Sequence, residues 1–172
     1  MALRQVGRGS TPFVSAAFQE PARLRELDEL CESFTSNHVA NRASRLQGRA
    51  FWNGVTKTFF NAPNTALAPP SPSFHHLAPV FGALTSLLGL ERGMALRMFL
   101  YQHLRGWVAS GVRLGIIGPM EGQGLQHRLG LEAEDVAVRS LQLTIEDIAQ
   151  VAPLLEMWQG AQDRLYSRLF QS

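Results

Sequence analysis

The stretch from Met94 to Ile117 constrains the fold of this chain most strongly. It is apolar for most of its length, but polar or charged side chains interrupt it at Arg97, Gln102, His103, Arg105 and Arg113. A membrane-spanning helix tolerates few such side chains, so we expect a helix buried inside a soluble protein. One apolar stripe comprises Leu96, Leu100, Leu104, Trp107, Gly111 and Leu114, and a second comprises Met94, Met98, Tyr101, Val108 and Val112. A helix that is apolar on most of its circumference is predicted at the centre of a bundle.

The other apolar segments also follow helical spacing. Residues 21–34, 37–60 and 74–89 each predict one helix, and Pro119 predicts a short helix after Gly118. Acidic residues at 132–135 and the Thr144 motif are typical of helix N-termini, so two further helices are expected there. No segment alternates as a strand would. The prediction is an all-α bundle of seven or eight helices in a single domain, residues 1–172, with a Pro-rich loop at 61–73.

Composition excludes several classes of function. A net charge of +2 provides no strong field for nucleic acid. The single cysteine, Cys31, excludes an intrachain disulfide and suits a reducing cytosol. The first ten residues hold no apolar run of signal-peptide length. We therefore expect a cytoplasmic protein that binds neither nucleic acid nor membrane.

Sequence motifs for catalysis or cofactor binding do not occur. The residues around Lys57 lack the frame of a P-loop, and residues 118–127 lack the third glycine and the preceding strand of a dinucleotide site. His75 and His76 are adjacent, so on a helix they would point about 100° apart and could not easily share a metal. We predict no catalytic, cofactor-binding or metal-binding residue, and expect each histidine to be exposed or hydrogen-bonded.

Two sets of residues at helical spacing stand out in the segment 37–60. Ala40, Ser44 and Gly48 form a row of small residues, which lets a second helix approach closely. Arg42, Arg45 and Arg49 form a basic stripe on another face of the same helix. The stripe is either a solvated face or a contact for an acidic protein partner. We expect the three arginines to be mostly exposed.

The chain ends on the unusually apolar segment LYSRLFQS, residues 165–172. Docking its four large apolar side chains would contribute about 1.5–3 kcal/mol each, or about 6–12 kcal/mol together. Ordering eight residues costs about 1–2 kcal/mol each in backbone entropy, or about 8–16 kcal/mol together. The two nearly cancel, so we expect this tail to become ordered on a partner that supplies an aromatic pocket and a carboxylate for Arg168.

Five segments resemble the UreF family of urease accessory proteins in order and spacing. They are TPFVSAAF, HVANRASRLQGRAF, FHHLAPVFGALTSLLGL, GPMEGQGLQHRL and the ending YSRLF. The region QVAPLLEMWQGAQDRLYSRLF is most similar to the plant-type members. The resemblance implies an all-α, non-enzymatic protein. It also implies a homodimer that binds a UreD/UreH-type accessory protein, recruits a UreG-type GTPase and helps deliver nickel to apo-urease.

The resemblance also implies which residues contact partners. Tyr166, Ser167, Arg168, Leu169 and Phe170 match the family's C-terminal element, which docks the UreD/UreH-type protein, while Gly118, Gly122 and Gln123 match a glycine-rich segment near that surface. Nickel and GTP are implied on the partner proteins, so no cofactor is expected on this chain. Nothing here matches the family's N-terminal PTGGF-like region, so the chain looks N-terminally incomplete. We expect an open apolar groove beside helix 94–117 in consequence.

Two alternatives to this reading stay open at the level of sequence. The chain could be a helical adaptor unrelated to urease. It could also be a direct nickel carrier that uses His75 and His76.

Overall fold

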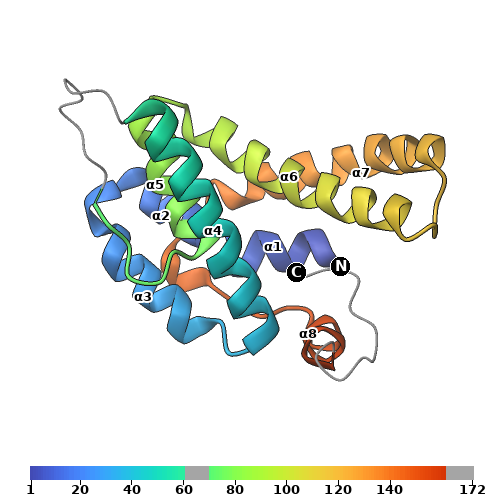
Figure 1. Cartoon of the computed structure of the whole chain (residues 1–172), viewed down its shortest axis with the longest axis horizontal. Coiled ribbons are helices and arrows are strands. Elements are labelled where there is room, and N and C mark those ends of the chain that lie inside the picture. The colour runs from blue at the N-terminus through green and yellow to red at the C-terminus, as the bar shows by residue number, and fades with distance from the viewer. Residues whose placement is uncertain (61–69, 162–172) are drawn as a thin grey trace.

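The computed structural model of the chain describes residues 1–60 and 70–161. In these ranges the backbone forms helices and turns and contains no strand, so the all-α prediction is confirmed. Figure 1 shows a helical body from which one pair of helices projects. The elements are α1 Ala2–Gly9, α2 Thr11–Gln19, η1 Pro21–Arg23, α3 Leu24–Phe34, α4 His38–Phe59, α5 Leu77–Leu87, α6 Arg92–Arg113, α7 Pro119–Ser140, η2 Ile145–Asp147 and α8 Pro153–Gly160.

The central helix of the body is α5. All of its residues from Leu77 to Thr85 are buried, because α2, α3, α4 and α6 pack around it. The closest approach is to α2 at Gly82, where a Cβ atom would lie 2.1 Å from the carbonyl oxygen of Val14. Phe81 of α5 packs against Phe51 of α4 and Phe99 of α6, with ring centroids 5.0 and 5.3 Å away.

The helix predicted at 94–117 is α6, and it is not the central one. Leu96, Leu100 and Leu104 of the first stripe are buried in the core, whereas its later members Trp107 and Leu114 are exposed. In the second stripe Met94, Met98 and Tyr101 are exposed, whereas Val108 is buried and Val112 is half-buried. Each predicted stripe is therefore covered along only part of its length, because the helices that pack on α6 differ from one end to the other.

Helix α7 is longer than the sequence pattern predicts. The short helix expected at Pro119 and the helix expected at 132–135 are one continuous helix, Pro119–Ser140. The acidic residues lie in its interior, where Glu134 pairs with Arg97 of α6 and Asp135 pairs with Arg139. Their charges are thus matched by arginines rather than by the dipole of a helix N-terminus.

The Thr144 motif is also used differently from the prediction. Thr144 caps only the 3-10 turn Ile145–Asp147, through hydrogen bonds to the Asp147 carboxylate. The chain then runs without helix to Ala152, and the last described helix, α8, begins at Pro153.

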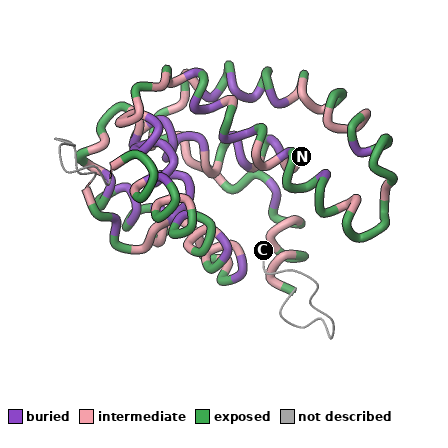
Figure 2. Tube along the Cα trace, turned by 45° about the horizontal axis from the view of Figure 1, so that its top comes forward, coloured by how far each residue is buried: buried purple, intermediate pink, exposed green. Residues whose placement is uncertain are grey.

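Helices α6 and α7 form an antiparallel hairpin that extends away from the body (Figure 1). The turn between them passes through Gly115, whose φ of +68° suits glycine. Helix α1 packs on α7 near the body, and at the start of α2 the Thr11 hydroxyl donates a 2.6 Å hydrogen bond to the Gly7 carbonyl oxygen and lies 2.8 Å from Ser140 Oγ of α7. Figure 2 shows that buried residues concentrate in the body and become sparse towards the far end of the hairpin.

Candidate functional site

The α6–α7 hairpin carries an apolar surface that no described element covers. We define the α6–α7 outer face by its exposed apolar residues Met94, Met98, Tyr101, Leu131 and Val138. Tyr101 is 53% exposed and Leu131 is 79% exposed. A hollow of about 530 Å³ lies between the two helices at Tyr101 and Leu131. Exposed apolar and aromatic side chains beside a hollow are typical of an interaction site.

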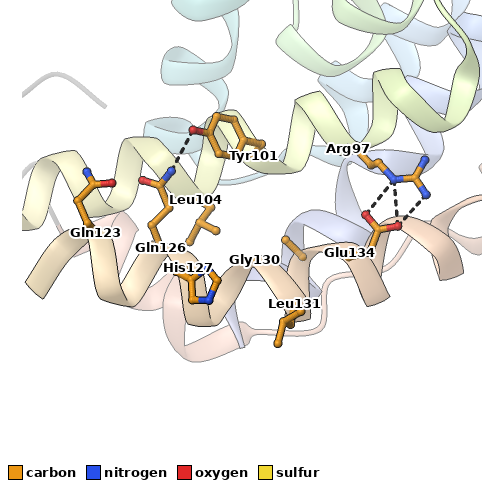
Figure 3. A pocket seen from close by; sticks show the side chains of 10 residues that line it. Arg97, Tyr101, Leu104, Gln123, Gln126, His127, Gly130, Leu131 and Glu134 are labelled. Atoms are coloured by element: carbon orange, nitrogen blue, oxygen red, sulfur yellow. Dashed lines mark hydrogen bonds and ion pairs between the residues drawn. The ribbon is translucent and has the colours of Figure 1, made fainter.

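Polar side chains border this hollow and are already paired with one another (Figure 3). Arg97 of α6 binds Glu134 of α7 through its Nε at 2.8 and 3.0 Å and through a second nitrogen at 2.7 Å. This pairing lowers the pKa of Glu134 and raises the pKa of Arg97. The Tyr101 hydroxyl accepts a 3.0 Å hydrogen bond from Gln126 Nε2. The side chains are therefore held in place before any partner arrives.

This arrangement has the anatomy of a protein–protein interface. Apolar and aromatic side chains line a hollow, and four polar side chains at its rim are paired within the chain. Tyrosine and arginine are enriched among the residues that dominate binding energy at such interfaces. His127 also lines the hollow, but the described residues place no nucleophile, base and orienting group together there. This surface is therefore suited to binding another protein.

A buried polar network joins α3, α4 and the segment before α5. The Asp28 carboxylate is fully buried and accepts hydrogen bonds from three consecutive backbone N–H groups. Phe74 and His75 donate to Oδ2 at 2.5 and 3.0 Å, and His76 donates to Oδ1 at 2.7 Å. A hydrogen bond from an N–H group to a carboxylate is stronger than one between two neutral groups. Asp28 therefore sets the path of the backbone into α5.

His76 extends this network from its own side chain. Its Nε2 lies 2.7 Å from a Glu32 oxygen, and its Nδ1 lies 3.1 Å from Ser44 Oγ. Because a carboxylate only accepts hydrogen bonds, Nε2 donates to Glu32. Burial raises the pKa of Glu32, but hydrogen bonds from Asn41 and His76 outweigh it, so the net effect is a lowered pKa. The histidine thus has a structural role here.

Comparison with known proteins identifies the family. A model of the UreF family matches residues 1–130. The chain is 32% identical over 169 residues to urease accessory protein F of Arabidopsis thaliana, covering 94% of this chain and 70% of that protein. It is 31% identical over 176 residues to urease accessory protein F of Oryza sativa subsp. japonica, covering 98% and 67%. The chain belongs to the UreF family of urease accessory proteins. The resemblance seen in the sequence is thereby confirmed.

A more distant relative also aligns with the whole chain. An uncharacterized UreF-like urease accessory protein of Schizosaccharomyces pombe is 26% identical over 185 residues, covering 100% of this chain and 79% of that protein.

The glycine-rich segment expected at the partner surface lies at the start of α7. Gly118 precedes the first helical residue and is exposed, and Gln123 lines the hollow of the α6–α7 outer face. Gly122 is buried instead, because a Cβ there would lie 3.0 Å from Val112 and 3.1 Å from Val108 of α6. In this UreF-family chain Gly122 therefore lets the two helices pack, while Gln123 faces outwards. The C-terminal residues expected to bind a partner, Tyr166, Ser167, Arg168, Leu169 and Phe170, lie outside the described residues.

The predicted arginine stripe is present on α4, but its three members differ in exposure. Arg42 and Arg49 are exposed. Arg45 is half-buried, with a guanidinium nitrogen 3.7 Å from Glu32 and its guanidinium carbon 5.3 Å from the centre of the Phe74 ring. Part of this stripe thus faces an acidic residue of its own chain.

The row of small residues on α4 packs mainly against the turn that leads into α5. At Gly48 a Cβ atom would lie 1.9 Å from the carbonyl oxygen of His75. Ser44 accepts a 3.2 Å hydrogen bond from the backbone N–H of Leu77. Gly48 and Ser44 therefore make a close approach, but to the residues before α5 and its first residue, whereas the spacing predicts a second helix along the whole row.

Helical spacing does not reveal three residues of these sites. It predicts Arg97 only as an interruption of an apolar helix and Glu134 only as part of a helix start, and it gives Asp28 no role. Their partners lie 37 and 46 or more residues away in the chain, beyond the reach of helical spacing. The available signal for Asp28 is its place next to Leu27 of an apolar stripe.

The described residues contain no group of three or more His, Cys, Asp or Glu side chains placed to hold a metal ion. Among the helices of the same residues, none has both the length and the apolarity needed to cross a bilayer.

Proposed function

We propose that this chain acts as a non-enzymatic scaffold in urease maturation. In this proposal it forms a homodimer in the cytoplasm, binds a UreD/UreH-type accessory protein, and recruits a UreG-type GTPase that delivers nickel to apo-urease. Membership of the UreF family carries the proposal. The α6–α7 outer face supports it, because it offers apolar anchors and pre-paired polar groups suited to protein recognition.

A pull-down with the two accessory partners, with and without GTP, tests this scaffold role directly. The variant Tyr101→Asp/Leu131→Asp places charge on the α6–α7 outer face. The matched control is Phe59→Asp, which alters an exposed apolar residue at the end of α4. We expect the double variant to lose partner recovery at least tenfold and the control to retain it. Equal recovery of all three proteins would contradict a role for this face, and no recovery of either partner by the unaltered chain would overturn the scaffold proposal.

The C-terminal residues Tyr166–Phe170 are proposed to contribute a second contact to the UreD/UreH-type protein. Removing residues 165–172 should then abolish binding of that partner, while helical content and melting temperature stay nearly unchanged. Circular dichroism and pull-down on the same preparation measure both. Loss of the fold, or binding that survives truncation, would show that the tail belongs to the core.

Nickel and nucleotide are proposed to reside on the partner proteins. His76 supports this assignment, because both its ring nitrogens have partners within the chain. Equilibrium dialysis with nickel alone provides the test. Sub-micromolar binding that is lost in the variant His75→Ala/His76→Ala would favour a direct nickel carrier instead.

A further inference from the structure

A second cleft, separate from the α6–α7 outer face, lies between α8 and the helical body. Its volume is about 540 Å³, within the range of about 300–1,000 Å³ typical of sites that enclose a ligand. Buried apolar side chains of the body, among them Leu77, Ala78 and Phe99, line it on one side. Trp107 of α6 and residues of α1 and α4 also line it.

Helix α8 forms one wall of this cleft and does not fill it. None of its residues is buried. Leu155, Glu156 and Gln159 line the cleft, whereas Met157 and Trp158 are exposed. The Asn37 side chain holds the helix to the body through a 2.8 Å hydrogen bond to the carbonyl oxygen of Glu156. The apolar floor of the cleft is therefore left without a described element to cover it.

The described part of the chain stops at Ala161, two residues after Gln159 in the wall of this cleft. Eleven residues follow, 162–172, and they include the large apolar side chains Leu165, Tyr166, Leu169 and Phe170. Eleven extended residues span up to about 40 Å, so this segment is long enough to turn back into the cleft. We propose that residues 162–172 bind in the cleft of their own chain when no partner protein holds them.

The charges of the cleft and of the segment are complementary. Among the described residues that line the cleft, Glu156 is the one acidic side chain and there is no lysine or arginine. Burial lowers the pKa of His103, which also lines the cleft, so this imidazole is neutral at pH 7. The segment supplies two arginines, Arg164 and Arg168, and one acidic residue, Asp163, so its side chains carry a net charge of +1. An arginine beside Glu156 would place a charge-assisted contact at the rim while the aromatic side chains enter the apolar interior.

This docking would make the C-terminal segment a switch between two sites. One site is the cleft of its own chain, and the other is the accessory partner. Binding of the segment to the accessory partner rests on the proposed function, but its docking in the cleft does not. Either of these two hypotheses can therefore fail without the other.

Cysteine cross-linking in the full chain tests the docking. Cys31 also lines the cleft, and burial raises its pKa to about 12, so it is first changed to serine. The test pair is then Gln47→Cys, in the cleft, with Phe170→Cys in the segment. The control pair is Leu131→Cys, on α7, with the same Phe170→Cys. Both Gln47 and Leu131 are exposed, so exposure of the thiol does not favour either pair.

We expect the cleft pair to form an intramolecular disulfide at least tenfold faster than the control pair at low protein concentration, as measured by mass spectrometry. A synthetic peptide of residues 162–172 should slow this cross-link at least fivefold by competing for the cleft. Equal rates for the two pairs, products that join two chains, or no effect of the peptide would each overturn the proposal. Failure to bind an accessory partner in a parallel pull-down would count against the proposed function and leave the cross-linking result intact.

Discussion

Gly48 shows how much of this fold depends on single residues. It is the point of α4 nearest to the turn before α5, and a Cβ there would lie 1.9 Å from His75 O and 2.7 Å from the Leu77 nitrogen. Both neighbours are backbone atoms, so they cannot move aside as a side-chain end could. The same turn is fixed from its other side by Asp28, which accepts all three hydrogen bonds from residues 74–76.

Gly48→Ala should therefore destabilise the protein by at least about 2–3 kcal/mol, because the turn or α4 must shift to admit the methyl group. Gly54→Ala on the same helix is the matched control. Nothing lies within 4 Å of a Cβ at Gly54, so this change should stabilise the protein by up to about 1 kcal/mol through helix propensity. Urea unfolding followed by circular dichroism measures both, and a neutral Gly48→Ala would contradict the close approach.

Asp28→Ala should cost about 3 kcal/mol or more, since it leaves three backbone N–H groups, among them the buried one of His76, without their acceptor. Glu29→Gln is the control, because the neighbouring Glu29 is exposed and its carboxylate accepts a hydrogen bond from the Ser73 hydroxyl, which an amide oxygen can also accept. The expected change for the control is within about 0.5 kcal/mol. Equal stabilities of the two variants in urea unfolding would mean that Asp28 does not hold the turn.

At the scale of elements, adjacent residues of the α6–α7 hairpin differ in role: some pack the two helices together and others lie on the outer face. Gly122 faces α6, where it admits Val108 and Val112, while Gln123 beside it lines the outer hollow. The Arg97–Glu134 pair then links the two helices across the outer face. Because both side chains of this pair are partly exposed, we assign it a role in geometry and little in stability.

Gly122→Leu should force the two helices apart and lower the free energy of unfolding by about 1–3 kcal/mol. Gly124→Leu is the control, since its Cβ would meet only the flexible end of Arg128 at 3.7 Å. In pull-down, Gly122→Leu should also weaken partner recovery, because it displaces Tyr101 relative to Leu131. An equal effect of both substitutions would show that Gly122 is not a packing position.

At the scale of the whole molecule, acid should destabilise this protein. Burial lowers the pKa of His103 below its usual 6.5, against the hydrogen bond to the Phe99 carbonyl. The unfolded chain therefore takes up the proton first, so stability falls as the pH drops below about 6.5. Burial and Arg49 lower the pKa of His75 in the same direction. The pKa of Glu32 is lowered in the folded state, so the unfolded chain also binds this proton first. Stability therefore continues to fall as the pH drops from about 4.5 through the folded pKa of this carboxyl.

His103→Gln should flatten the upper part of this profile. One proton difference between the folded and unfolded states corresponds to a slope of up to about 1.4 kcal/mol per pH unit. The free energy of unfolding, measured by urea titration between pH 7 and pH 5, should therefore decline less steeply in the variant, with a residual slope from His75. Parallel profiles for the two proteins would show that His103 is not buried in its neutral form.

The sequence by itself determined the fold class and several local features. Helical spacing located α4, α5 and α6, and the small residue at Gly48 marked a close approach. The motif order identified the family. These features could be predicted because each depends on residues within a few turns of one helix, where spacing translates directly into a shared face.

Only the tertiary structure decided which apolar face is covered and which polar groups meet. Spacing shows that α6 has two apolar stripes, but the placement of the neighbouring helices decides which part of each is covered: Leu96 and Val108 are buried, while Met98 and Trp107 are exposed. Likewise Asp28 caps a turn 46 residues away, and Glu134 becomes the interior partner of Arg97 rather than the start of a helix. Such contacts join segments distant in the chain, and their geometry exists only once the helices have packed.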